Sequence, residues 1–256
     1  MKVVILGSGN VATHLGRALK TSGHSILQVW SRSKINADLL ASELNSLGIN
    51  SFEDLDKDGD IYIISVSDDA IPFVASKFPF KDKLLVHTSG TTGIDVLEKA
   101  SAKRGVLYPL QTFSKQRDID FEVIPIAIEG DSQETVESLS TLAKTLVDKV
   151  VLFDSEKRRA LHIAAVFACN FTNHFYSVAH QILKENHLDF DLIRPLIAET
   201  ASKVQTFLPE EVQTGPAVRN DQITLNKHIK FLEDKPELED LYKMISQSII
   251  NFYQKA

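Results

Sequence analysis

Apolar and polar positions along the first 153 residues predict strands and helices in regular alternation. The continuous apolar run Val3–Leu6 is typical of a strand buried on both faces of a parallel sheet. Further strands are predicted at 25–30, 61–64, 84–87, 106–107, 124–128 and 150–153. A first helix is predicted to follow the opening glycines and to end at about residue 22. Further helices are predicted at 34–47, 71–78, 94–102 and 132–147. This alternation indicates an α/β doubly wound sheet.

The pattern changes near Asp154, and no convincing strand follows. Residues 156–185 form one long helical pattern that is nearly apolar through Ile163–Cys169. A helix that is apolar almost all round is buried, either in a core or at a subunit contact. Further helices are predicted at 189–207, 218–233 and 236–253. We therefore expect an α/β domain at 1–153 and an all-α domain at 154–256.

Composition adds limits on compartment and partners. The 256 residues are 43% hydrophobic and 24% charged, which is ordinary for a globular protein with a large core. The net charge of −6 argues against nucleic acid and anionic membrane surfaces as partners. Cys169 is the single cysteine, and the opening apolar run stops at Gly7, unlike a secretory signal. Since no apolar run is long enough to span a membrane, we expect a soluble, cytoplasmic protein.

A glycine-rich turn follows the first strand directly. It reads Gly7-Ser8-Gly9-Asn10-Val11-Ala12, a G-x-G-x-x-A fingerprint placed just before the first helix. The first glycine permits the tight turn, the second lets the backbone approach a pyrophosphate, and the small alanine lets helix and strand pack closely. The helix N-terminus then points its N–H groups at the phosphates. The fingerprint predicts a Rossmann domain with a mostly parallel sheet; the alternative is a glycine-rich turn in another α/β fold.

The end of the second strand favours NADP over NAD. NAD-binding domains carry an acid about 20 residues after the fingerprint, to hold the ribose 2′-hydroxyl. That place reads Ser31-Arg32-Ser33-Lys34, and the first acidic residue of the chain is Asp38. Arg32 can hold a 2′-phosphate through two N–H groups, with the serine hydroxyls as added donors. The alternative is that Arg32 is a solvated loop residue.

Two more polar loops follow strands at the edge where nucleotides bind. They read Ser65-Val66-Ser67-Asp68 and His87-Thr88-Ser89-Gly90. We predict Val66, Ser67 and Thr88 as neighbours of the cofactor; ordinary turn chemistry is the alternative. His87 is a candidate proton donor to a carbonyl or imine. A core histidine with satisfied hydrogen bonds explains that residue equally well.

These motifs, together with Tyr108-Pro109-Leu110-Gln111 and the segments 162–170 and 214–221, resemble a known bacterial family. It consists of Rossmann-like NADP oxidoreductases with a helical C-terminal domain of unknown function, and the resemblance covers nearly the whole chain. More distantly, the chain is similar to pyrroline-carboxylate reductase, ketopantoate reductase, β-hydroxyacid dehydrogenases and deazaflavin-dependent NADP reductases. The resemblance implies hydride transfer at the cleft between the two domains. It also implies a 6-phosphogluconate dehydrogenase C-terminal-like domain and a homodimer through that helical domain.

The chain departs from these relatives at the expected catalytic helix. β-Hydroxyacid dehydrogenases and ketopantoate reductase use a lysine with nearby asparagines there. Here Lys157 lies near the helix start, and His162, Cys169, Asn170 and Asn173 share one side further along. One interpretation is a substrate cleft, with His162 as the acid and Asn170 as the residue that orients the substrate. The other is that these side chains hydrogen-bond to neighbouring helices or across a dimer.

The remaining candidates change the prediction little. Arg219 beside Asp221 could hold a substrate carboxylate, or the pair could simply cap a helix. We predict no metal site, because the histidines are scattered, and we expect Cys169 to be a small core residue. The predicted function is reduction of a small carbonyl or imine substrate by an NADP(H)-dependent oxidoreductase. The alternatives are a catalytically silent NADP-binding regulatory or scaffold protein and, less favoured, electron exchange with a reduced deazaflavin.

Overall fold

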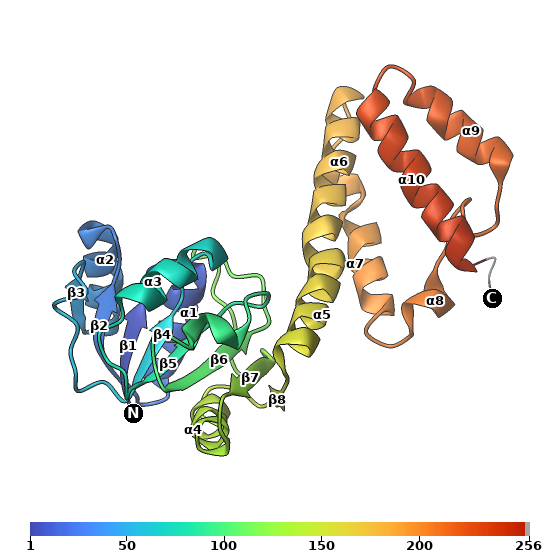
Figure 1. Ribbon diagram of the computed structural model, residues 1–256. Coiled ribbons are helices and arrows are strands. Elements are labelled where there is room, and N and C mark those ends of the chain that lie inside the picture. Colours follow the sequence, from blue (N-terminus) through green and yellow to red (C-terminus); the bar gives the residue numbers. More distant parts are fainter. Residues whose placement is uncertain (254–256) are drawn as a thin grey trace. The chain divides into compact units, whose positions relative to one another are not determined.

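A computed structural model describes residues 1–253 and divides the chain into two compact units, Met1–Phe175 and the part from Tyr176 onward. The first unit is built on one eight-stranded sheet in the order β3-β2-β1-β4-β5-β6-β7-β8 (Figure 1). All neighbouring strands are parallel except β6 and β7. The strands are β1 (Lys2–Leu6), β2 (Ser25–Trp30), β3 (Leu47–Ile49), β4 (Ile61–Ile64), β5 (Leu84–His87), β6 (Lys103–Pro109), β7 (Ile126–Gly130) and β8 (Val150–Leu152). The predicted doubly wound, mostly parallel sheet is confirmed.

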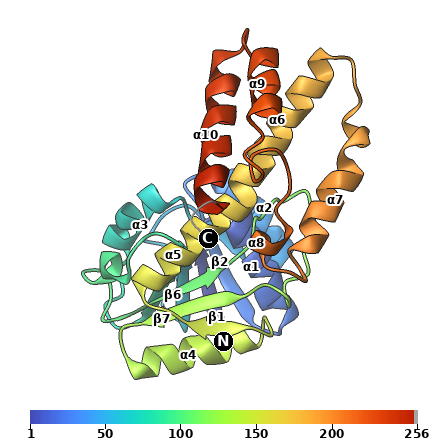
Figure 2. The ribbon, with the colours of Figure 1, turned by 90° about the vertical axis from the view of Figure 1, so that its right-hand side faces the viewer.

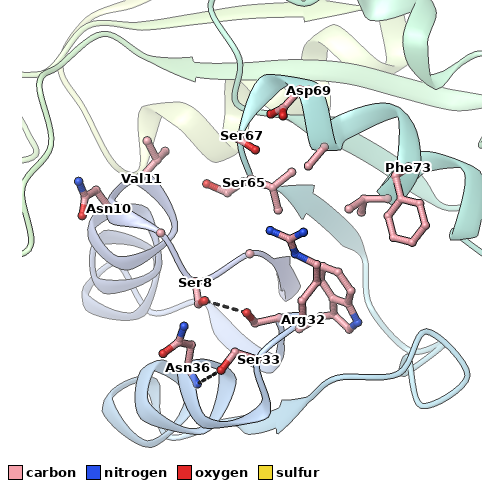
Figure 3. A pocket seen from close by; sticks show the side chains of 17 residues that line it. Ser8, Asn10, Val11, Arg32, Ser33, Asn36, Ser65, Ser67, Asp69 and Phe73 are labelled. Carbon is pink, nitrogen blue, oxygen red and sulfur yellow. Dashed lines mark hydrogen bonds between the residues drawn. The ribbon is translucent and has the colours of Figure 1, made fainter.

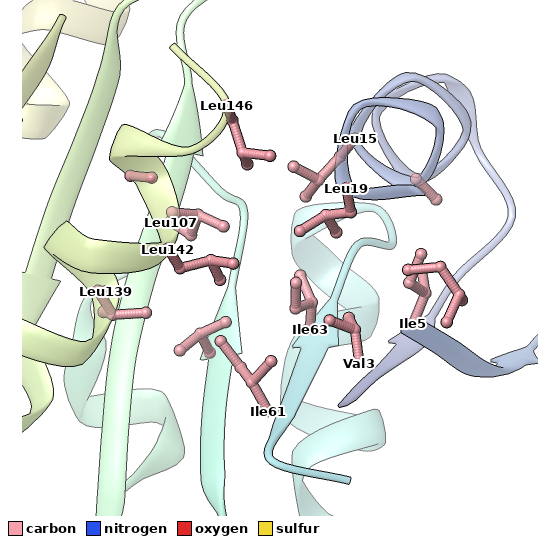
Figure 4. Close-up of a cluster of buried hydrophobic side chains, with 14 of the residues drawn as sticks. Val3, Ile5, Leu15, Leu19, Ile61, Ile63, Leu107, Leu139, Leu142 and Leu146 are labelled. Atoms are coloured by element: carbon pink, nitrogen blue, oxygen red, sulfur yellow. The ribbon is translucent and has the colours of Figure 1, made fainter. Parts of the chain in front are cut away.

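Helices cover both faces of this sheet, because successive side chains of a strand point to opposite faces. Val3 and Ile5 of β1 pack with α1, α2 and α4, as Figure 4 shows in part. Val4 and Leu6 pack on the other face with α3 and η2. The bounds are α1 (Asn10–Thr21), α2 (Lys34–Leu44), η1 (Asp68–Ala70), α3 (Ile71–Lys77), η2 (Ile94–Leu97) and α4 (Gln133–Lys144). The continuous apolar run Val3–Leu6 therefore contributes to two cores.

Several predicted helices are shorter in the structure, and for two of them the local cause is visible. The helix predicted at 34–47 ends at Leu44, because Asn45 adopts a left-handed conformation with φ of 55°. The chain then forms β3, which the sequence analysis did not predict and which pairs with β2. The helix predicted at 94–102 is only the 3₁₀ turn η2. It is followed by Ser101, whose hydroxyl donates to the carbonyl of Lys83 (2.5 Å) just before β6 begins.

The long helical pattern predicted at 156–185 is a run of three elements. They are α5 (Ser155–Ala165), a π-helical segment η3 (Val166–Phe171) and α6 (Thr172–Glu185). A π segment adds residues to a turn and shifts which side chains share a face. The apolar stretch is not in the core of this chain, since Ile163 and Phe167 are 50% and 65% exposed. Cys169 is exposed as well, so the expectation of a core cysteine was wrong.

Helix α5 is attached to the sheet through Arg158, which is fully buried. Its guanidinium pairs with Glu129 of β7 and donates to the carbonyls of Ser89 and Thr92. Ser155 donates to Glu129 through both its N–H and its hydroxyl. A buried charge is tolerated when its partners and remaining hydrogen bonds are all in place, as they are here. This cluster keeps the first two turns of α5 in the same unit as the sheet.

The second unit is all-helical over the residues that the structure describes. It contains the rest of α6, η4 (Phe190–Leu192), α7 (Arg194–Lys203), α8 (Pro209–Val212), α9 (Gln222–Phe231) and α10 (Pro236–Tyr253) (Figures 1 and 2). Its small core is formed by Ala217, Leu225 and Ile250. No helix within residues 1–253 is both long and apolar enough to cross a membrane. The division at residue 175 keeps α5 and η3 with the sheet, while the boundary at 154 marks the change of sequence pattern.

Candidate functional site

A cavity of about 830 Å³ opens beside the carboxyl ends of β1, β2 and β4 (Figure 3). This is the edge of an open α/β sheet where ligands bind. Most of the residues predicted to bind the cofactor line it. They are Gly7, Ser8, Gly9, Asn10, Val11, Ser31, Arg32, Ser33, Val66 and Ser67. Residues that lie close together in the sequence at each strand end therefore converge on one site.

The glycine-rich turn has the shape that a dinucleotide requires. Gly7 has φ of +143°, and a Cβ there would lie 1.9 Å from the carbonyl oxygen of Ser65. A Cβ on Gly9 would meet nothing within 4 Å, so the space above this residue is open to a ligand. Helix α1 has no side-chain N-cap hydrogen bond and no acid in its first turn. Its N-terminal amides thus remain for an anion, and the residues present fit a pyrophosphate.

The loop after β2 places a cation in this cavity. The Arg32 side chain projects into the cavity, on the side opposite the Ser8 turn (Figure 3). The hydroxyl of Ser8 donates to that of Ser31 (3.0 Å), and Ser33 caps α2 by accepting from the Asn36 N–H. The Ser67 hydroxyl, with a smaller contribution from Arg32, lowers the pKa of the exposed Asp69 carboxyl. A guanidinium with two nearby hydroxyls is suited to a phosphate group.

Three predicted residues lie outside the lining. Ala12 is fully buried under the turn, where its small size allows the close packing that was predicted for it. Lys34 pairs with Asp38 one helical turn away (2.6 Å). Thr88 is buried, and its hydroxyl donates to that of Ser65 (3.3 Å) behind the cavity wall.

The sequence analysis missed several lining residues. Trp30, Asn36, Asp69, Ala70, Phe73 and Val74 all line the cavity. The Trp30 ring lies 4.3 Å from that of Phe52, which makes an edge contact with Phe73. Trp30 ends β2 and the others follow β2 or β4 in the chain, which was the available signal. Trp30, Phe73 and Val74 have side-chain types that are common in cores, which hid their role.

His87 is held as a neutral core side chain. It is fully buried, its Nδ1 accepts from the N–H of Ser89 (3.2 Å), and its Nε2 faces the carbonyl of Gly93 (3.4 Å). Burial, with a smaller effect of the Arg158 charge, lowers its pKa to about 4. The ring therefore carries no extra proton near neutral pH. This geometry favours the alternative of a satisfied core histidine over a proton donor.

His162 lies beside Tyr108, a partner that the sequence analysis quoted only within the family motif. The Tyr108 hydroxyl is 3.0 Å from Nδ1 of His162, and the two rings make an edge contact. Burial raises the pKa of Tyr108 to about 12, so the phenol stays protonated near neutral pH. A Cβ on Gly90 would lie 2.6 Å from that same Nδ1 and 2.8 Å from Cζ of Tyr108. A side chain at residue 90 would therefore displace this pair.

The tyrosine and histidine open onto a second cavity of about 390 Å³ within the first unit. Cys169 and Asn170 of the π segment line it together with His162, whereas Asn173, predicted to share their side, is not among the lining residues. The other lining residues are Leu110, Gln111, Thr112, Leu161, Ala164, Ala165, Val166 and Ala168. An apolar cavity with a few convergent polar groups is typical of a small-molecule site.

The loop after β5 lies between the two cavities and bonds to the loop after β4. Thr88 bonds to Ser65 beside the nucleotide cavity, and Thr91 donates to the carboxylate of Asp68. Gly90, between these threonines, touches the tyrosine–histidine pair. In the loop after β5, Thr88 and Thr91 therefore bond to the loop that follows β4 on the nucleotide side. Gly90 of the same loop contacts the tyrosine–histidine pair of the second cavity.

Two further candidates have structural contacts. Lys157 is 70% exposed and lies 3.8 Å from Asp154, and it does not line either cavity. Asp221 caps α9 by accepting from the Thr224 N–H (3.1 Å), while Arg219 is exposed. The capping interpretation accounts for Asp221.

Comparisons with known proteins agree with this architecture. Residues 2–90 match the family described as NADP oxidoreductase coenzyme F420-dependent, and residues 124–249 match a domain of unknown function, DUF2520. A Bacteroides fragilis protein assigned to the NADP oxidoreductases, BF3122, is 41% identical over 98% of each chain, with a TM-score of 0.91. The chain belongs to this family of NADP oxidoreductases. Membership confirms both the resemblance and the cofactor class predicted from the sequence.

More distant structures share the fold. A reductive aminase from Aspergillus terreus, in complex with NADPH and ethyl-5-oxohexanoate, is 15% identical with a TM-score of 0.67 and covers 100% of this chain and 93% of its own. An imine reductase from Myxococcus stipitatus, in complex with NADP+, is 16% identical with a TM-score of 0.62, over 100% and 94%. No curated protein sequence matches the chain.

The state of His87 predicts a loss of stability in mild acid. The folded pKa of about 4 lies below the ordinary histidine value of 6.5, so the unfolded state takes up a proton that the native state does not. The free energy of unfolding should be highest above about pH 6.5 and fall by up to about 3 kcal/mol towards pH 4. Urea unfolding of the wild type and His87→Gln at several pH values measures this. An equally steep decline in the variant would contradict the assignment.

Proposed function

We propose that this protein is a reductase that uses NADPH to reduce a small carbonyl or imine compound. The observation that carries the proposal is the hydrogen-bonded Tyr108–His162 pair, which lines an apolar cavity and touches the loop beside the nucleotide cavity. Family membership supports the oxidoreductase class. The imine reductase and the reductive aminase, which have the same fold, make carbonyl and imine carbons the first substrates to test.

We propose that the nucleotide cavity holds NADP(H) with the pyrophosphate at the glycine-rich turn and the 2′-phosphate at Arg32. The glycine-rich turn and the N-terminus of α1 would bind the pyrophosphate, and Arg32 with Ser31 and Ser33 would bind the 2′-phosphate. Val66 and Ser67 would contact the cofactor on the side of β4, with Thr88 supporting them from behind. Bound NADPH supplies the hydride for the substrate carbon.

Reduction also needs a proton on the substrate oxygen or nitrogen, and we assign its delivery to His162. The Tyr108 oxygen fixes the ring through Nδ1, which leaves Nε2 for the substrate. A protonated imidazole would give its Nε2 proton to the oxygen or nitrogen as the carbon receives the hydride. The ring would then regain a proton from water. Asn170 would orient the substrate from η3. His87 has no part in this step.

The first experiment measures NADPH oxidation with a panel of keto acids, ketones with amines, and cyclic imines. Once a substrate is found, His162→Gln should lower kcat by about 100-fold or more, since a positioned acid contributes that much. Tyr108→Phe and Asn170→Ala should have smaller effects on kcat, because these residues position other groups. None of the three variants should change the Kd for NADPH, and His174→Gln, an exposed histidine outside the cavity, serves as control.

Two results would reject this assignment. Activity that survives both His162→Gln and Asn170→Ala would place the chemistry elsewhere. Tight NADPH binding with no turnover across the panel would favour the alternative of a catalytically silent NADP-binding regulatory or scaffold protein. The absence of a lysine at the expected position of the helix is the observation behind that alternative.

The choice between dinucleotides is predicted to depend on Arg32. Arg32→Gln should weaken NADP+ binding by about 10- to 100-fold, because a charge-assisted pair with the 2′-phosphate is lost. Binding of NAD+, which lacks that phosphate, should change little. Calorimetry with both dinucleotides measures the ratio, and Lys34→Gln is the matched control because Lys34 pairs with Asp38 outside the cavity. An unchanged ratio in Arg32→Gln would show that the 2′-phosphate binds elsewhere.

We also propose that the helical region from residue 154 onward forms the substrate cleft and a homodimer contact. Ile163, Phe167 and Phe171 recur at intervals of four along α5 and η3 and are 50%, 65% and 45% exposed. Such a row of exposed large apolar side chains is typical of an interaction site. Sedimentation should give a dimer for the wild type and a monomer for Phe167→Glu. A monomeric wild type would reject this proposal.

A further inference from the structure

The connection between β6 and β7 carries a segment that lies along the nucleotide-binding helix. We name residues 111–118 the strap. The Asn10 amide nitrogen donates to the carbonyl of Phe113 (2.9 Å), and Nε2 of His14 lies 2.9 Å from the carbonyl of Ser114. A carbonyl only accepts, so His14 donates. These contacts join residues about a hundred positions apart in the sequence and fix the start of the strap to α1.

Further contacts continue along the same face of α1. His14 is buried, with its ring 5.2 Å from that of Phe113. Arg17 lies 3.9 Å from the carboxylate of Asp118 at the end of the strap. Residues 10, 14 and 17 share one face of a helix, so the strap follows the helix for two turns. Its position is thus set by the same helix whose N-terminus faces the nucleotide cavity.

The strap places an ammonium group at the glycine-rich turn. Nζ of Lys115 donates to the carbonyl of Ser8 (2.8 Å), between Gly7 and Gly9 of the fingerprint. The lysine is exposed and has a long flexible stem, so its head group can move by a few ångströms. A neutral carbonyl is a weaker partner for an ammonium than a phosphate oxygen. A ligand with phosphates at this turn would therefore compete for the same cation.

The nucleotide cavity needs such a charge. Arg32 is the one basic residue among the described residues that line it, and the proposed function assigns Arg32 to the 2′-phosphate. The two charges of the pyrophosphate would otherwise meet only backbone amides and hydroxyls. We propose that Lys115 is a further dinucleotide-binding residue, an ammonium placed by the strap to bind the pyrophosphate. This inference rests on the proposed function, because it presupposes that the cavity binds a pyridine dinucleotide.

The strap would also connect the cofactor with the second cavity. Gln111 and Thr112, at its start, line the cavity that contains His162. When Lys115 engages a pyrophosphate, it would add a further anchor to the segment whose first residues line the second cavity. Dinucleotide binding should therefore slow hydrogen exchange of the strap amides.

The test compares three ligands by calorimetry: NADP+, NAD+ and 2′-AMP. Lys115→Met should weaken both dinucleotides by about tenfold or more, the loss expected for one charge-assisted hydrogen bond. Binding of 2′-AMP, which has no pyrophosphate, should stay the same, and Lys115→Arg should retain most of the affinity. Arg117→Met is the matched control, since it removes the same charge from the same strap and should bind like the wild type. Strap amides should be protected by NADP+ in the wild type and less so in Lys115→Met.

Each contrary outcome has a distinct meaning. Wild-type affinity of Lys115→Met for both dinucleotides overturns the inference and leaves the proposed function intact. A loss limited to NADP+ and 2′-AMP moves the lysine to the ribose phosphate and overturns the pyrophosphate assignment. Equal losses in Lys115→Met and Arg117→Met would mean a general charge effect, which also overturns it. A wild type that binds neither dinucleotide rejects the proposed function and this inference together. Unchanged melting of the free variants excludes misfolding.

Discussion

The buried guanidinium of Arg158 is the interaction on which the geometry of both cavities depends. It joins β7, through Glu129, to the loop after β5, through the carbonyls of Ser89 and Thr92. Because Arg158 and His162 are one helical turn apart, fixing the first also places the second against Gly90. The same charge helps to keep His87 neutral. A cation can be buried here because its donors find acceptors both on β7 and in the loop after β5.

The parts of the fold that the sequence predicts well are those decided by neighbouring residues. The strand, turn and helix around Gly7 follow from a local apolar run, a backbone angle that glycine tolerates, and a small residue at Ala12. The same holds for Arg32, whose place directly after β2 brings it to the nucleotide cavity. Parallel strands end at one edge of the sheet. A loop that follows a predicted strand can therefore be assigned to the site from its local sequence alone.

Features that depend on distant residues could not be read in this way. Tyr108 and His162 are 54 positions apart, and Lys115 and Ser8 are 107 apart. The helix predicted at 34–47 was too long because one residue, Asn45, takes a left-handed conformation that asparagine tolerates but does not require. The π segment at Val166–Phe171 shifts the register of a helix that the sequence shows as uniform. His87 has the chemistry of a proton donor and the environment of a core residue, and only burial decides between them.

The two cavities are connected by loops that follow β5 and β6, and this arrangement has a mechanical consequence. The sheet strands and their two cores are rigid, so the distance between the strand ends is fixed. The loops can respond to a ligand. The loop after β5 contacts the nucleotide side through Thr88 and the second cavity through Gly90, and the loop after β6 does so through Lys115 and Gln111. A dinucleotide that orders either loop therefore also orders residues that face the substrate. Binding energy from the phosphates, far from the reacting carbon, can in this way serve to organise the catalytic pair.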